Sequence, residues 1–210
     1  MIRVALVDDH ALIRRGLRDS LNDAGDISVV GEAADYGELR ELLRTIEFDV
    51  LLLDINLPGR SGLDVLHSLA DQPVKIRVLV LTMHPEEQYA IRALKAGAMG
   101  YLNKSADPAQ IITAIRTLHA GRKFITPAIA EALAERLSVD DTHAPHERLS
   151  DREFQTLIRL ASGKRLSDIA AELSLSPKTV TVYRTRVMEK LSVQTNAELT
   201  AYCLRNGLID

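Results

Sequence analysis

The sequence VLLLD at residues 50–54 decides how the first half of this 210-residue chain folds. Four apolar residues are too few for a helix, so they predict a short strand that ends at the carboxylate of Asp54. Pro58, Gly59 and Gly62 then mark a loop, and helical spacing begins at Leu63. A strand that is apolar at every position is typical of a parallel sheet with helices on both faces.

The same strand-then-helix unit recurs on both sides of this stretch. Further strands are predicted at residues 2–7, 28–33, 77–82 and 101–102, and helices at 11–24, 36–46, 63–69, 86–96 and 108–120. Five such repeats predict an α/β doubly wound sheet of five parallel strands with right-handed crossovers. In a sheet of this kind, functional sites form beyond the carboxyl ends of the strands.

The composition describes a globular chain with an uneven charge distribution. Apolar residues make up 46% and charged residues 26%, which excludes a largely disordered chain. No stretch is long enough to span a bilayer, no signal segment opens the chain, and the single cysteine, Cys203, fits a reducing compartment. A soluble cytoplasmic protein without a membrane partner is therefore expected. Residues 1–146 carry a net charge of −5 and residues 147–210 one of +2, so only the rear part is expected to meet a polyanion.

Polar residues gather where the predicted strands end. Asp8 and Asp9 follow the first strand, Asp54 ends the third, Thr82 ends the fourth and Lys104 follows the fifth. Carboxylates within ~4 Å of one another repel by several kcal/mol per pair and need a cation, and an oxygen-only ligand set with room for water favours Mg²⁺. A lysine and a threonine opposite them can hold phosphoryl oxygens, and a carboxylate that attacks phosphorus becomes an acyl phosphate. The set describes an aspartate that accepts phosphate.

Each of these residues also has an ordinary structural explanation. Asp8 and Asp9 can cap the following helix, Asp54 can be a turn residue, Thr82 a strand end and Lys104 a solvated loop charge. A phosphatase of the haloacid dehalogenase type also uses Asp, Thr, Lys and Mg²⁺. That phosphatase chemistry requires a second carboxylate, as acid and base, two residues after the nucleophile. This sequence has Asn56 at that position. A third alternative is a domain that takes no phosphate and only mediates dimerisation.

The rear of the chain is predicted to be entirely helical. Residues 122–148 form a linker with one helix at about 126–137, and residues 149–210 form a four-helix unit. Its first helix carries a capping box of Ser150 and Glu153. A short helix at 167–173, a turn and a third helix capped by Ser176 with Pro177 at its first position give a helix-turn-helix. The fourth helix runs from residue 196 to 206.

The third helix of this unit separates into two faces. Val180, Tyr183, Val187 and Leu191 recur at helical spacing and are expected to point inward. Small Thr and Val side chains on the opposite face suit base edges and thymine methyls, and flanking basic residues can reach phosphates. The alternative is a helical bundle that binds protein through this face. The predicted DNA contacts are Lys178, Thr179, Thr181, Val182, Arg184, Thr185, Arg186 and Lys190.

These two constellations resemble a known family. The pocket residues, with the loop from Pro58 to Gly62, resemble the receiver domain of two-component response regulators. The stretch LSDREFQTL at 149–157, the run from Leu166 through Ser176, Thr179 and Val180, and the pair Lys190-Leu191 resemble the LuxR-type helix-turn-helix. Together they are similar to the NarL/FixJ class, and the resemblance covers nearly the whole chain. It implies a receiver at residues 1–121 with the flavodoxin-like strand order 2-1-3-4-5.

The resemblance also implies roles for individual residues. Asp54 is the phosphoacceptor, and Asp8, Asp9, Asp54 and the backbone carbonyl of Asn56 hold Mg²⁺. Thr82 and Lys104 contact the phosphoryl group, and Tyr101 matches the aromatic position that turns inward on activation. Two positions depart from the pattern, because Ser105 stands where many receivers have proline and Tyr183 where the class has histidine.

The implied protein is a transcription regulator and not an enzyme. A histidine kinase is its phosphate donor, and phosphorylation favours a homodimer on palindromic double-stranded DNA with half-sites about one helical turn apart. With about four basic contacts to phosphate in each rear unit, the dimer is expected to show a salt slope near −7.

Overall fold

The structure is a computed structural model that describes residues 1–70, 76–84, 86–138 and 144–209. The chain divides into two compact units, residues 1–138 and 139–210. Each unit has a buried apolar core of its own.

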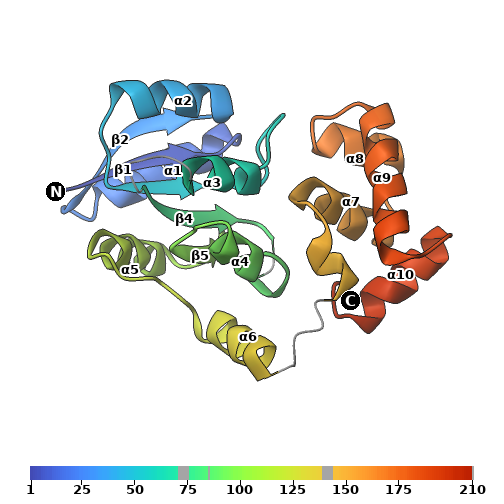
Figure 1. Ribbon diagram of the computed structural model, residues 1–210. Coiled ribbons are helices and arrows are strands. Elements are labelled where there is room, and N and C mark those ends of the chain that lie inside the picture. The colour runs from blue at the N-terminus through green and yellow to red at the C-terminus, as the bar shows by residue number, and fades with distance from the viewer. Residues whose placement is uncertain (71–75, 85, 139–143, 210) are drawn as a thin grey trace. The chain divides into compact units, whose positions relative to one another are not determined.

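The first unit is built on a five-stranded parallel sheet (Figure 1). Its strands lie in the order β2-β1-β3-β4-β5, which confirms the predicted strand order. The fifth strand is longer than predicted because its backbone stays paired with β4 from residue 100 to residue 103. The strands are β1 Ile2–Val7, β2 Ile27–Ala33, β3 Val50–Leu53, β4 Arg77–Thr82 and β5 Gly100–Asn103.

Helices cover both faces of this sheet (Figure 1). Helices α1 Ala11–Asn22 and α5 Pro108–His119 bury apolar side chains against one face, where Leu52 and Leu79 belong to the same cluster. Helices α2 Tyr36–Thr45, α3 Gly62–Ala70 and α4 Glu86–Lys95 lie over the other face. Each fully buried leucine contributes roughly 1.5–3 kcal/mol, so this double cover stabilises strands that have no solvent face.

The pairing register sets the carboxyl ends of the central strands side by side. Val7 pairs with Leu53, so the next residues of β1 and β3, Asp8 and Asp54, leave the sheet together. Thr82 pairs with Asn103, and the amide of Lys104 donates to the carbonyl of Thr82 at 2.8 Å. The fold therefore brings these polar residues to one edge of the sheet, as the switch-point rule predicts.

Helix α6, Pro127–Ser138, belongs to the first unit. The sequence predicts it as part of the linker, but in the structure it packs against α4. The Thr126 hydroxyl donates to Glu86 Oε2 at 2.5 Å, and Ile129 is buried. The predicted linker also includes residues 139–143, which lie outside the described residues.

The described residues of the second unit form helices joined by short turns, without a strand, which confirms the predicted fold class. The unit consists of a 3₁₀ turn η1 Pro145–Arg148 and helices α7 Asp151–Ala161, α8 Leu166–Glu172, α9 Pro177–Leu191 and α10 Asn196–Arg205. The capping box of α7 is present, with Ser150 N donating to Glu153 Oε2 at 2.8 Å. The predicted linker ends in η1 because His146 is bound to the Tyr202 hydroxyl of α10 at 3.0 Å. Among the described residues, no helix has both the length and the apolar character that crossing a membrane requires.

Candidate functional site

Two carboxylates and a lysine form a buried charge cluster at the carboxyl edge of the sheet. Asp8 and Asp54 are 4% and 3% exposed. The Lys104 Nζ atom lies 2.5 Å from Asp8 Oδ2 and 2.7 Å from Asp54 Oδ2. Burying either carboxylate without a partner would cost several kcal/mol, so one ammonium group stabilises both.

This cluster shifts the protonation of its own members. Burial raises the pKa of Asp54 above its ordinary value, and the charge of Lys104 opposes that shift. Burial by itself would lower the pKa of Lys104, but the Asp54 and Asp8 carboxylates outweigh it and raise the pKa. Lys104 therefore stays cationic at neutral pH, ready to contact an anionic group.

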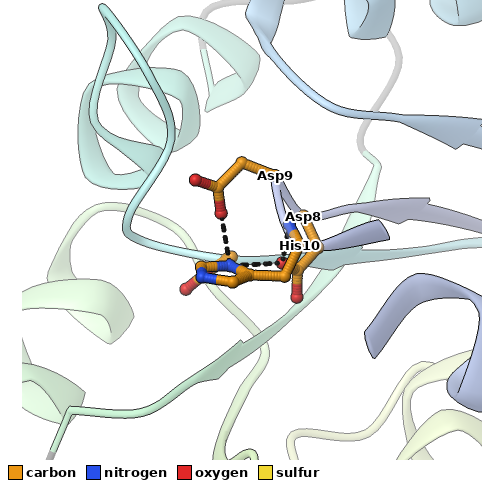
Figure 2. A group of neighbouring side chains, drawn as sticks. Asp8, Asp9 and His10 are labelled. Atoms are coloured by element: carbon orange, nitrogen blue, oxygen red, sulfur yellow. Dashed lines mark hydrogen bonds and ion pairs between the residues drawn. The ribbon is translucent and has the colours of Figure 1, made fainter. Parts of the chain in front are cut away.

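Asp9 and His10 extend the cluster toward solvent (Figure 2). His10 Nδ1 lies 2.6 Å from Asp9 Oδ1 and 3.3 Å from Asp8 Oδ1. One donor atom each from Asp8, Asp9, His10 and Asp54 lies within 4.8 Å of the others. The three predicted carboxylates thus converge and fit a hard divalent cation. The sequence prediction missed His10, whose only signal is its position directly after the acidic pair.

The Thr82 hydroxyl is fully buried beside this cluster. Its Oγ1 atom has no hydrogen-bond partner among the described residues, although it lies close enough to Asp54 to favour the ionised carboxylate. An unsatisfied buried hydroxyl costs about 1–3 kcal/mol, so such groups in native structures call for an explanation. Here the hydroxyl can donate to an oxygen atom of a group attached to Asp54.

Asn56, His84 and Tyr101 connect the cluster to the neighbouring loops. The backbone N–H of Asn56 donates to Asp54 Oδ1 at 3.3 Å, and the side-chain Oδ1 atom of Asn56 lies 3.0 Å from His84 Nε2. The Tyr101 side chain is fully buried, and its hydroxyl donates to the His84 carbonyl at 2.9 Å. The structure therefore places Tyr101 inward, one loop away from Thr82.

The loop after β5 is held together by Asn103. Asn103 Nδ2 donates to the His84 carbonyl at 3.2 Å, and Asn103 Oδ1 accepts from the backbone N–H and the hydroxyl of Ser105. The serine that replaces the usual proline thus belongs to a hydrogen-bonded turn on either side of Lys104.

Gly62 allows the loop after β3 to approach the acceptor strand closely. Its N–H donates to the Ile55 carbonyl at 2.8 Å. A Cβ atom at this position would stand 2.2 Å from the Asp54 carbonyl oxygen and 2.8 Å from Ile55 Cα. Any side chain here would displace the backbone of Asp54, so the close approach explains the glycine.

The second candidate site is the helix-turn-helix of α8 and α9. Ser174 takes a left-handed conformation with φ 52°, which turns the chain sharply after α8. Ser176 then caps α9, because its Oγ accepts from the Thr179 N–H at 3.1 Å. The start of α9 therefore follows the predicted capping by Ser176, and the turn after α8 lies where it was predicted.

The two faces of α9 separate nearly as predicted. Val180, Val187 and Leu191 are buried, whereas Tyr183 is half-buried. On the outer face, Lys178, Thr181, Val182, Thr185 and Arg186 are exposed, while Thr179 and Arg184 are half-buried. The hydroxyls of Thr181 and Thr185 donate to carbonyls of their own helix, so this face offers methyl groups and hydroxyl lone pairs outward.

The four basic residues predicted on α9 fall into two pairs. Arg184 donates to Asn196 Oδ1, and Lys190 Nζ lies 2.6 Å from Glu153 Oε2, so both are engaged within the domain. In the part of the chain that the structure describes, no hydrogen bond or ion pair engages the side chain of Lys178 or Arg186. Helical periodicity does not predict this division, because the partners of Arg184 and Lys190 come from other helices.

Comparisons with known proteins match both units. Residues 4–116 match the response regulator receiver domain, and residues 147–203 match the bacterial regulatory proteins of the luxR family. Response regulator UvrY of Escherichia coli (strain K12) is 38% identical over 209 residues, which are 99% of this chain and 96% of that protein. Response regulator GacA of Pseudomonas aeruginosa is 37% identical over 211 residues, with 100% and 99% covered.

Solved structures give the same result. A LuxR-family response regulator from Aurantimonas sp. SI85-9A1 has a TM-score of 0.60 at 38% identity, covering 65% of this chain and 98% of that chain. RcsB of Salmonella enterica serovar Typhimurium, bound to promoter rprA with the phosphomimetic BeF₃⁻, has a TM-score of 0.63 at 26% identity, covering 96% and 98%.

The fold, the acidic edge and the helix-turn-helix therefore define a response regulator of a two-component system. The chain belongs to the NarL/FixJ class of this family, with a receiver domain and a LuxR-type DNA-binding domain.

Proposed function

We propose that this chain is a phosphorylation-controlled transcription regulator. A histidine kinase transfers a phosphoryl group to Asp54 with the help of Mg²⁺, and the phosphorylated receiver favours a homodimer that binds palindromic DNA. One observation carries this proposal. At the carboxyl edge of the sheet, Lys104 Nζ lies within 2.7 Å of carboxylate oxygens of both Asp8 and Asp54.

The transfer step uses groups that already lie at this edge. A carboxylate oxygen of Asp54 forms a bond to phosphorus while the bond from phosphorus to the histidine nitrogen of the kinase breaks. The ammonium of Lys104 and the buried hydroxyl of Thr82 are available to the phosphoryl oxygens. Their role is to stabilise negative charge on the group being transferred.

The remaining acidic residues suit a magnesium ion. Asp8, Asp9, Asp54 and the Asn56 backbone carbonyl would hold Mg²⁺, which neutralises charge on the transferring phosphoryl group when bound. Asp8 already shares its carboxylate with Lys104 and His10, so these residues orient it before any ligand arrives.

Phosphorylation would then change the balance of charge in the pocket. Acyl phosphate adds negative charge beside Lys104 and Thr82 and draws both toward Asp54. Tyr101 is joined to this region through the His84 carbonyl, so a shift in the Thr82–His84 segment reaches a fully buried aromatic side chain. The Tyr101 ring is already inward in this structure, so its proposed role as the switch residue is supported by this connection to His84 and not by an inward turn of the ring.

The output surface is the exposed face of α9. Lys178 and Arg186 supply uncompensated positive charge, while Thr181, Val182 and Thr185 face outward between them. The similar protein RcsB was solved on promoter DNA, which supports the same use of this domain here. A two-fold dimer requires half-sites about one helical turn apart.

The test uses Asp54→Asn beside the control Asp64→Asn, which changes a carboxylate of α3 outside the pocket. The wild-type and control proteins should gain one phosphoryl mass with acetyl phosphate and Mg²⁺, dimerise in light scattering and select a palindrome from a random DNA pool. Asp54→Asn should do none of these in response to acetyl phosphate. Full phosphate-dependent dimerisation of Asp54→Asn would refute Asp54 as the acceptor, and turnover of a generic phosphomonoester would revive the phosphatase alternative.

A further inference from the structure

An arginine of α1 reaches back to the peptide group that joins the two acidic residues after β1. The Nη1 atom of Arg14 donates a hydrogen bond to the main-chain carbonyl of Asp8 at 2.5 Å. The Asp8 N–H donates to the Ala33 carbonyl, where β2 ends, but the Asp8 carbonyl lies beyond the last paired residue of β1. Among the described residues, no other donor reaches this carbonyl. Arg14 therefore supplies the hydrogen bond that the sheet no longer provides.

This single hydrogen bond restricts the placement of two carboxylates. The peptide unit between Asp8 and Asp9 is planar, so fixing the direction of its carbonyl restricts the Cα positions of both residues. From this backbone, Asp8 Oδ2 lies 2.5 Å from Lys104 Nζ, and Asp8 Oδ1 accepts from the His10 N–H at 2.9 Å. A rotation of the peptide would move both carboxylates relative to Asp54.

The Arg14 guanidinium is directed at this carbonyl rather than at the nearest carboxylate. Glu32 Oε2 of β2 lies 3.6 Å from Arg14 Nε, which makes an ion pair but not a hydrogen bond. The Nε atom is buried and has no hydrogen-bond partner among the described residues. A bidentate pair with Glu32 would satisfy this costly buried donor. The observed geometry leaves Nε unsatisfied and keeps the contact with Asp8, which indicates that this contact sets the position of the arginine.

Arg18, one turn further along α1, provides a comparison. Its Nη1 atom donates to Glu32 Oε1 at 2.9 Å, and its Nε atom donates to Asp19 Oδ1 at 3.2 Å. The Arg18 side chain is 39% exposed, whereas that of Arg14 is 17% exposed. In the described part of the chain, Arg18 makes no hydrogen bond or ion pair with the acidic edge. It is thus an ordinary surface partner of the same glutamate.

We propose that Arg14 is a positioning residue for phosphoryl transfer to Asp54. Its hydrogen bond holds the peptide between Asp8 and Asp9 so that their carboxylates are presented together beside the acceptor. This inference rests on the proposed function, because it assigns a supporting role in the same reaction. Arg14 acts only through the main chain of Asp8 and not on the transferring group itself.

The experiment compares Arg14→Met with the matched control Arg18→Met in the full chain. Both changes remove a guanidinium paired with Glu32, but only the first removes the hydrogen bond to Asp8. Calorimetric titration with Mg²⁺ alone should show about tenfold weaker binding in Arg14→Met and a change of less than about twofold in Arg18→Met. With acetyl phosphate, the maximal rate of phosphorylation should also fall about tenfold in Arg14→Met, while KM for acetyl phosphate changes by less than about threefold.

Two further readouts separate positioning from general stability. The NMR resonance of the Asp8 carbonyl carbon reports the hydrogen bond, so it should shift in Arg14→Met and stay unchanged in Arg18→Met. Arg14→Lys keeps a cationic donor and guards against a simple loss of folding. It should bind Mg²⁺ and accept phosphate less well than the wild type and better than Arg14→Met.

Equal losses in the two methionine variants would overturn the proposal, as would wild-type Mg²⁺ binding and phosphorylation in Arg14→Met or Arg14→Lys. The Mg²⁺ titrations and the NMR spectra involve no phosphodonor, so they hold or fail separately from the proposed function. Failure of Asp54 to accept phosphate in the wild type would refute that function. The placement of Asp8 by Arg14 would still be decided by these two measurements.

Discussion

Lys104 at the acidic edge and Lys178 at the start of α9 are both proposed to bind phosphate, but their surroundings are opposite. The Lys104 side chain is 4% exposed and lies within 2.7 Å of two carboxylates. Lys178 is exposed, and no partner engages it among the described residues. Burial requires the first charge to be compensated before any ligand arrives, whereas water already solvates the second.

This difference predicts two kinds of recognition. A phosphoryl group at the receiver must compete with Asp8 and Asp54 for Lys104, so binding there depends on exact placement of one group. At α9, solvated basic side chains neutralise DNA phosphates and release counterions from the DNA. The affinity for DNA therefore falls as the salt concentration rises. The receiver pocket thus recognises one phosphoryl group in one position, whereas the α9 face recognises a polyanion.

The largest effect is expected from Lys104→Ala, which tests the compensation of buried charge. The substitution leaves Asp8 and Asp54 buried without their cation, which should cost about 3–5 kcal/mol of unfolding free energy. In chemical denaturation, Mg²⁺ should raise the unfolding free energy of the variant by more than that of the wild type. Lys123→Ala, which removes an exposed lysine, is the control and should change stability little. A similar small loss in both variants would contradict the compensation argument.

A smaller effect is expected from Gly62→Ala. The added methyl group meets the backbone of Asp54 and Ile55, so overpacking should destabilise the receiver by roughly 1–3 kcal/mol and slow phosphorylation by acetyl phosphate. Gly16→Ala is the matched control, since nothing lies within 4 Å of its Cβ position in α1. That change should stabilise the chain by about 0.5–1 kcal/mol. Thermal unfolding that ranks the two variants the other way would contradict this account.

The two lysines of α9 should separate DNA binding from stability. Lys178→Ala should make the salt slope of the dimer less negative by about 2, because it removes one unpaired positive charge from each subunit. Lys190→Ala should leave that slope nearly unchanged because Lys190 is paired with Glu153. Gel-shift titrations over a salt series measure both slopes. An equal change of slope in the two variants would show that Lys190 also contacts DNA phosphates.

Lys190→Ala should instead reduce stability in a way that depends on pH. Burial alone would raise the pKa of Glu153, but Lys190 and Ser150 outweigh burial and hold the pKa below its ordinary value of 4.5. The stabilisation is therefore present above pH 4.5 and disappears as the pH falls through the lowered value. The difference in unfolding free energy between wild type and Lys190→Ala should be clear at neutral pH and shrink in acid.

The smallest expected effect concerns Cys203. The thiol is fully buried in α10, and burial raises its pKa to about 11. Native protein should react negligibly with a thiol reagent near neutral pH, and denatured protein should react fully. Rapid labelling of the native chain would show that α10 opens readily.

Much of the fold follows from local sequence signals, and part of the site does not. The apolar run at 50–53 and its acidic end predicted both β3 and the position of Asp54, because a parallel sheet fixes where strands end. The contact of His10 with Asp8 and Asp9 depends on side-chain directions after the strand has ended. The pair of Lys190 and Glu153 joins residues of different helices. Periodicity predicts which face a residue occupies but not which partner it meets there.

The packing of α6 against α4 restricts how the receiver can assemble. A partner that approaches α4 at Glu86 meets the Thr126 hydroxyl already bound there, and Ile129 already buried. Any association through this part of α4 must first displace the chain's own helix, so the segment leaving the receiver acts as a built-in competitor for that surface.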